Sequence, residues 1–159
     1  MKAELFDFRA SKGTWILVAH RSGARLYETR YRPRGVHLLR EFPNPEGRLQ
    51  EREMGADRPG RTYTSLGLRS AMDPQTEFQV QVAQSFARKL SEVLEQGRTS
   101  NQFDRLWLVA EPSFLGLLRA NLSDVTAKCV VGSETKDLHQ VPEHQMRRSL
   151  DFVFERLAG

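Results

Sequence analysis

Arginine gathers in this chain at places where it could bind an anion, and the clearest lies in the polar stretch of residues 46–72. The centre of that stretch reads Asp57-Arg58-Pro59-Gly60-Arg61. Proline presets the backbone of a turn and glycine permits a positive φ, so the pentapeptide predicts a tight turn with two guanidinium groups outward. A guanidinium binds phosphate or carboxylate through paired hydrogen bonds. We therefore interpret this turn as a contact point for an anionic partner.

A second concentration of arginine lies in the first 40 residues. They hold nine Lys or Arg and three acids, a net charge of +6, whereas the whole chain carries +4. Such a basic footprint favours an anionic polymer, and RNA fits best. The alternative is an arginine-rich face that is only solvated. The residues expected to bind RNA or another partner are Arg21, Arg25, Arg32, Arg34, Arg48, Asp57, Arg58, Pro59, Gly60 and Arg61.

Other chemistry-bearing residues give weaker signals. The only cysteine, Cys129, excludes an internal disulfide and a multi-cysteine zinc site, and its apolar neighbours predict a packed thiol. His139 and His144 are five apart across Pro142, a spacing that does not place two ligands on one helix face, so we expect surface or capping roles. His20 follows an apolar stretch at a turn, where a ligand could sit, but a structural role is preferred. We expect no catalytic residue, no metal and no cofactor.

The arginines need elements that position them, and the first half of the chain predicts strands. Residues 15–19 form a continuous apolar run, residues 24–29 alternate with period two, and residues 36–42 make a third strand. The short links between them predict an antiparallel meander. Residues 46–72 lack an apolar period and predict a long exposed loop.

The second half predicts helices alternating with strands. Asp73 and Pro74 suit the start of a long helix, and Gly97 its end. A strand over 103–110, a short helix over 112–122 and a strand over 127–131 follow, and Pro142 begins a final helix. The apolar stripes are Phe78, Val82, Phe86, Leu90, Val93 and Leu94 on the long helix, and Met146, Leu150, Val153 and Leu157 on the last. This alternation predicts parallel pairing, hence an α/β fold with a mixed sheet.

Length and composition bound the class of protein. The chain has 159 residues, which fits one domain, with residues 1–13 as an extension of a core over 14–151. No stretch reaches the roughly 20 apolar residues of a membrane span, and residues 1–12 lack the apolar segment of a signal peptide. With a single cysteine, these features favour a cytoplasmic protein.

Several segments together resemble the bacterial family of proteins required for attachment to host cells. The resemblance runs from about residue 14 to 150 and is carried by residues 15–19, 24–25, 46–48, 57–61, 86–88, 103–106, 110–119 and 136–138. That family is similar in turn to the central domain of archaeo-eukaryotic peptide-chain release factors and of Pelota. The resemblance implies the same order of elements: three strands, a long exposed loop, a long helix, then strand–helix–strand–helix.

The same resemblance implies a role near RNA. In release factors the long loop carries Gly-Gly-Gln, whereas this chain has Pro59-Gly60-Arg61 and no Gly-Gly-Gln, so peptidyl-tRNA hydrolysis is not carried over. We expect an RNA- or ribosome-associated accessory factor without chemistry of its own. Two alternatives stay open. One is a hydrolase acting on a nucleic acid or acyl ester through the 46–72 loop, and the other is a protein-interaction factor that affects host-cell attachment indirectly.

Overall fold

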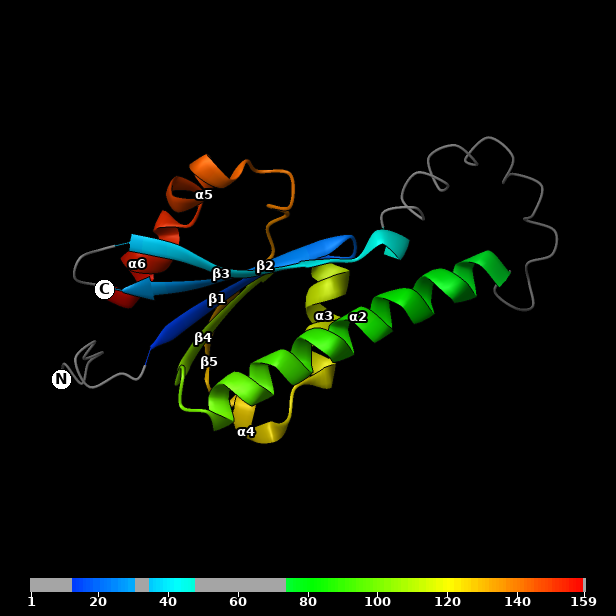
Figure 1. The fold of residues 1–159 in the computed structure, drawn as a ribbon, viewed down its shortest axis with the longest axis horizontal. Coiled ribbons are helices and arrows are strands. Elements are labelled where there is room, and N and C mark those ends of the chain that lie inside the picture. The colour runs from blue at the N-terminus through cyan, green and yellow to red at the C-terminus, as the bar shows by residue number, and fades with distance from the viewer. Residues whose placement is uncertain (1–12, 31–34, 48–73, 159) are drawn as a thin grey trace.

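The computed structural model describes residues 13–30, 35–47 and 74–158, and builds them around a five-stranded sheet (Figure 1). The strands lie in the order β3-β2-β1-β4-β5. Their bounds are β1 Thr14–His20, β2 Gly23–Arg30, β3 Gly35–Pro43, β4 Arg105–Ala110 and β5 Val130–Glu134.

The sheet is mixed, as the sequence predicts. β1 pairs with β2, and β2 with β3, in antiparallel register, so the predicted meander is confirmed. β1 pairs with β4, and β4 with β5, in parallel register. Parallel neighbours need a long crossover connection. Helices lie in both of these connections, between β3 and β4 on the way from β1 to β4, and between β4 and β5. β1 therefore lies at the junction of the two halves of the fold.

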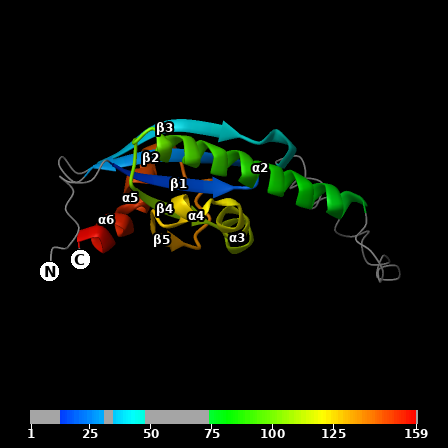
Figure 2. The same cartoon turned by 90° about the horizontal axis from the view of Figure 1, so that it is seen from below.

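Helices cover both faces of this sheet, and every residue of β1 is buried between them (Figures 1 and 2). On one face, Trp15 and Leu17 pack with α2 (Pro74–Thr99) and α3 (Pro112–Asn121). On the other, Ile16 and Val18 pack with α5 (Glu143–Ser149) and α6 (Asp151–Ala158). Because side chains alternate along a strand, His20 shares the second face.

α2 is the long predicted helix, with two corrections. Its stripe is buried at Val82, Phe86, Leu90 and Leu94, but Phe78 is 49% exposed because the beginning of α2 projects beyond the sheet (Figure 1). Gly97 does not end the helix, which continues to Thr99. The end is set by Asn101, whose φ of 60° lets the N–H of Gln102 reach the Gly97 carbonyl at 2.9 Å.

Other boundaries differ from the prediction. The first strand of the second half begins at Arg105 instead of 103. The last strand is shifted to Val130–Glu134 because α4 (Asp124–Ala127), capped by Ser123, occupies the residues before it. The predicted final helix is divided into two helices, because the backbone leaves helical geometry at Leu150. Pro142 is the N-cap residue that precedes α5, and not its first residue. Met146, Leu150 and Val153 are buried as predicted, whereas the side chain of Leu157 lies outside the described residues.

Two smaller predictions concern Cys129 and the loop. Cys129 is half-buried against the core, not fully enclosed, and burial raises the pKa of its thiol. Of the predicted loop 46–72, the structure describes only Glu46 and Gly47, in a helical turn after β3 where the Gly47 N–H donates to the Asn44 carbonyl at 3.0 Å. Among the described residues, no helix combines the length and the apolar character needed to cross a membrane.

Candidate functional site at the carboxyl end of β1

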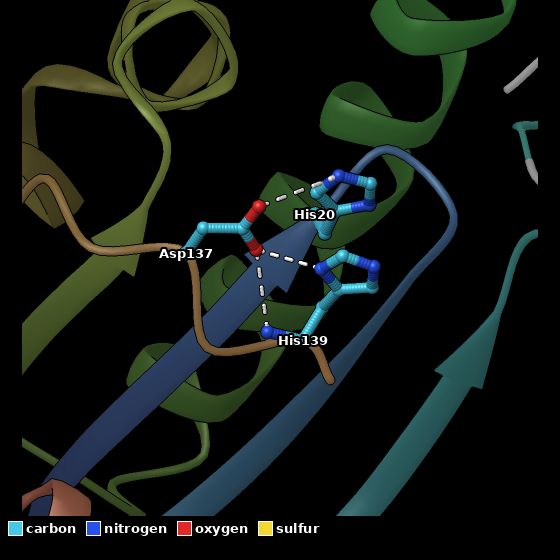
Figure 3. Close-up of side chains that lie close together, drawn as sticks. All are labelled: His20, Asp137 and His139. Atoms are coloured by element: carbon cyan, nitrogen blue, oxygen red, sulfur yellow. Dashed lines mark hydrogen bonds and ion pairs between the residues drawn. The ribbon is translucent and has the colours of Figure 1, made fainter. Parts of the chain in front are cut away.

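Two histidines and an aspartate meet where β1 ends, and we call His20, Asp137 and His139 the histidine–aspartate cluster (Figure 3). His20 is the last residue of β1. Asp137 and His139 lie in the segment between β5 and α5, which crosses from the edge of the sheet back toward β2. One ligand-type atom from each of the three side chains lies within 4.8 Å of the others.

The two imidazole rings are stacked. Their centroids are 3.7 Å apart and their planes differ by 8°. The His20 side chain is 8% exposed, whereas that of His139 is 24% exposed and that of Asp137 47%. One ring therefore belongs to the protein interior, and the other two groups open the cluster to solvent.

Asp137 links the two rings. Its Oδ1 accepts a hydrogen bond from Nδ1 of His139 at 2.6 Å and from the His139 backbone N–H at 3.3 Å. Its Oδ2 lies 4.0 Å from Nε2 of His20. Burial alone would raise the pKa of Asp137, but the hydrogen bonds from His139 and the charges of both rings together lower it. Asp137 is thus an anion at neutral pH, aimed at both imidazoles.

The hydrogen bonds of His20 assign its tautomer. The backbone N–H of Ser22 donates to Nδ1 at 3.2 Å, and the Ser22 hydroxyl lies 2.9 Å from the same nitrogen. A backbone N–H can only donate, so Nδ1 is the acceptor and the proton of the neutral ring is assigned to Nε2. Nε2 is the nitrogen that faces Asp137.

Arg25 holds the segment that carries Asp137 and His139. Its Nη2 donates to the backbone carbonyls of Leu138, His139 and Val141 at 3.0–3.2 Å. Its Nη1 pairs with Glu143 at 3.2 Å, and the side chain is 15% exposed. A planar guanidinium can bridge several oxygens at once, which the ammonium of lysine cannot do in the same way. Arg25 therefore fixes the backbone of the segment relative to β2.

Tyr27 supports the same connection. Its hydroxyl donates to Oε1 of Glu143 at 2.8 Å, the carboxylate that also pairs with Arg25. Burial, together with this hydrogen bond, raises the pKa of Tyr27. The phenol thus stays protonated and acts as a donor at the beginning of α5.

The residues predicted from the sequence lie partly beside this cluster. Arg21 is half-buried in the β1–β2 turn directly after His20, and its carbonyl accepts a hydrogen bond from Asn44 at 2.6 Å. Arg25 lies beneath the segment that carries His139. The remaining predicted residues fall outside the described part of the chain: Arg32, Arg34, Arg48, Asp57, Arg58, Pro59, Gly60 and Arg61.

Sequence reasoning did not find the cluster because it compared His139 with His144. His144 is exposed on α5, whereas the partner of His139 is His20, more than a hundred residues away. One sequence signal points to this pairing. His20 ends a buried strand, Asp137 and His139 follow another strand, and the carboxyl ends of parallel strands meet at one edge of a sheet.

The cluster offers two kinds of chemistry. A neutral imidazole beside a carboxylate can accept and return a proton near neutral pH. Two imidazoles and a carboxylate are also a donor set that holds divalent transition metals. Both uses need access from solvent, which the exposed Asp137 and half-buried His139 provide.

Comparison with known proteins gives one informative match. A family model described as "Protein required for attachment to host cells" matches residues 15–150, which include the whole cluster. No curated protein matches the chain. A solved structure described as "Archaeal protein" is 13% identical with a TM-score of 0.41, over 92% of this chain and 39% of that one. The chain thus spans about two fifths of the length of that structure.

Proposed function

The chain belongs to the family of proteins required for attachment to host cells, and from this premise we propose that it is an RNA- or ribosome-associated accessory factor. Its main support is the net charge of +6 within residues 1–40. Arginine is suited to RNA because its guanidinium binds a phosphate through two parallel hydrogen bonds and stacks on bases.

The positions of two arginines on the sheet support this proposal. Arg40 is exposed on β3, the outer strand of the meander, with its guanidinium 4.6 Å from the ring centre of Phe42. Arg21 lies in the β1–β2 turn, beside the end of β3, where Asn44 donates a hydrogen bond to its carbonyl at 2.6 Å. A polyanion that follows the meander can therefore meet arginines at both places.

The order of the elements along the chain is the second support. Three antiparallel strands are followed by a long helix, a parallel strand, a helix and another parallel strand. This is the order that the resemblance to release factors and Pelota implies. The chain has no Gly-Gly-Gln, so an accessory role fits it better than peptide release.

Ribosome co-sedimentation tests the proposal. The purified chain should pellet with ribosomes at about 50 mM salt and be released at about 200 mM, because phosphate contacts exchange with counterions. The double variant Arg32→Ala/Arg34→Ala should bind less, and each lost contact to single-stranded RNA should reduce the salt slope by about 0.7. The matched control is Arg88→Ala/Lys89→Ala, which removes the same charge from exposed positions of α2.

The outcome distinguishes an RNA-associated factor from a protein-interaction factor. If the chain does not pellet at low salt, or if both double variants lose binding equally, the arginines do not define an RNA site. A protein-interaction factor that acts on attachment indirectly would then be favoured.

The loop turn provides an independent test. Replacing Arg58 and Arg61 with alanine should weaken RNA binding and leave the melting temperature nearly unchanged, since exposed ion pairs contribute only about 0–1 kcal/mol to folding. A variant that melts several degrees lower and still binds normally would identify the turn as a structural clamp.

Hydrolysis of a nucleic acid or an acyl ester is a second candidate function. The observation that favours it is the 2.6 Å contact between Nδ1 of His139 and Asp137, an arrangement that a general base uses. Single-stranded RNA and an aminoacyl-tRNA should then be cleaved by the wild type and not by His139→Gln. Equal turnover with both proteins would contradict this function.

A further inference from the structure

We propose that the histidine–aspartate cluster is a binding site for a divalent transition metal ion, of which zinc is the best fit. Three donor groups of suitable type already lie within 4.8 Å of one another, and two of them come from a segment more than a hundred residues from the third. Metal binding at this place does not depend on the proposed association with RNA, because it uses other side chains.

The identity of the donors selects the class of metal. Two imidazole nitrogens and one carboxylate oxygen suit zinc, cobalt, nickel or iron, whereas magnesium and calcium prefer oxygen alone. Three protein ligands are the number found in zinc sites that keep a position for water. The 47% exposure of Asp137 leaves room for such a water.

His20 presents Nε2 to the metal. Its Nδ1 faces Ser22, with the hydroxyl oxygen at 2.9 Å. In the free protein Nδ1 accepts the Ser22 N–H at 3.2 Å and Nε2 carries the ring proton. Metal binding at Nε2 therefore requires the proton to move to Nδ1, where the Ser22 hydroxyl oxygen would accept it in place of that N–H contact. Ligating histidines commonly have such a partner, which sets the tautomer and the orientation of the ring. Ser22 is therefore a positioning residue of the proposed site.

His139 is the ring that turns toward the metal. The present contacts are 2.6 Å from Asp137 to His139 and 4.0 Å from Asp137 to His20. Ligand atoms around a tetrahedral zinc are about 3.3 Å apart, given bonds near 2.0–2.1 Å. Each of these two distances thus changes by less than about 1 Å, and the third, between nitrogens of the two rings, is at most 4.8 Å. The rings are nearly parallel, so one must rotate for their nitrogens to converge, and His139 is the more exposed and lies outside any helix or strand.

Arg25 keeps this rotation local. It binds the carbonyls on both sides of the His139 side chain, so the backbone stays in place while the ring turns. Its own positive charge, which would oppose a bound cation, is paired with Glu143.

The test uses the full chain without a histidine tag, treated with a chelator and then titrated with zinc chloride in a calorimeter. We expect one equivalent to bind, and magnesium chloride to give no saturable heat. Cobalt(II) should produce visible absorption bands of a four- or five-coordinate site. His139→Gln should lose zinc affinity by more than the roughly 10–100-fold that loss of a second-sphere partner costs, and Ser22→Ala should fall within that range.

His144→Gln is the matched control, because it removes an exposed histidine from α5 outside the cluster, and its affinity should equal that of the wild type. Circular dichroism must show that each variant is folded. His139→Gln is preferred over a change at buried His20 for this reason. The proposal is overturned if the wild type and His139→Gln bind zinc equally, or if neither gives a saturable signal. The stacked rings would then be a structural contact only.

Discussion

Gly97 lies directly against the indole ring of Trp15, on the face of α2 that packs on β1. A Cβ added at this position would come within 2.5 Å of Cη2 of Trp15 and 3.1 Å of the Phe103 ring. Trp15 and Phe103 in turn contact each other, with ring centroids 4.6 Å apart. The glycine is present in the last turns of α2 because no other residue leaves room for this pair.

Gly97→Ala should destabilise the protein by about 1–3 kcal/mol, the usual cost of overpacking a core. This is the opposite of the roughly 1 kcal/mol that alanine gains over glycine in a helix. The control is Gly116→Ala in α3, where a Cβ meets nothing within 4 Å, so that variant should be as stable as the wild type or more so. Chemical unfolding of both measures the difference. An equal gain in stability in both variants would show that the Trp15 ring moves to make room for the added methyl group.

Glu95→Gln should alter stability in acid. The Glu95 carboxylate accepts hydrogen bonds from Thr126 at 2.6 Å and Ser123 at 2.8 Å, and with Arg98 these lower its pKa to about 2. A lowered folded-state pKa stabilises the fold above the ordinary value of 4.5, and this stabilisation is lost as the pH falls toward 2. The free energy of unfolding should therefore decrease less steeply between pH 4.5 and 2 in the variant.

Glu92→Gln, on an exposed position of the same helix, is the control for that series. Its unfolding should follow the pH dependence of the wild type. Identical acid profiles for the wild type and Glu95→Gln would contradict the role assigned to Glu95 in joining α2 to α4.

Tyr27→Phe should act at alkaline pH. The raised pKa of Tyr27 means that the folded state keeps its proton, so its stabilising effect is complete below pH 10, the ordinary value, and is lost as the pH rises further. At pH 7 the variant should lose about 1 kcal/mol, the typical net value of a hydrogen bond. Above pH 10 its stability should fall less than that of the wild type. Urea unfolding at pH 7 and 10.5 tests both, and parallel declines would argue against a protonated phenol.

Arg25→Lys should loosen the segment between β5 and α5. Lysine keeps the charge but cannot bridge three carbonyls and Glu143 together. Amide hydrogen exchange at residues 138–141 should accelerate by at least tenfold, equivalent to about 1.4 kcal/mol of lost local stability. Arg21→Lys, in the neighbouring turn, should leave this exchange unchanged. Unaltered exchange in Arg25→Lys would show that Arg25 does not hold this segment in place, and would favour a role for Arg25 in binding RNA.

The predictable part of the fold is the part with local signals. Residues 15–19 are apolar without alternation, which is typical of a strand covered on both faces, and β1 is such a strand. Short links predicted the meander, and the stripe of Val82, Phe86 and Leu90 predicted the buried face of α2. These features depend on neighbours within a few residues, so the sequence alone is sufficient.

The missed features depend on distant partners. The apolar spacing of Met146, Leu150 and Val153 continues through the break between α5 and α6, so the break leaves no trace in the pattern. Phe78 continues the stripe of α2, but the sheet ends before it. The cluster is the extreme case, because His20 acquires its partners only when the segment after β5 crosses the sheet.

The central position of β1 has a consequence for synthesis of the chain. Once Pro43 has been made, the three-stranded meander can pair, and a hairpin forms within about 1–10 μs. The strand that covers the other edge of β1 starts at Arg105, 62 residues later, which takes about 3–12 s at roughly 5–20 residues per second. During that interval the nascent chain carries an open edge on its most apolar strand, the kind of surface that joins chains to one another. Chaperone capture at this stage of translation should therefore decide the yield of native protein.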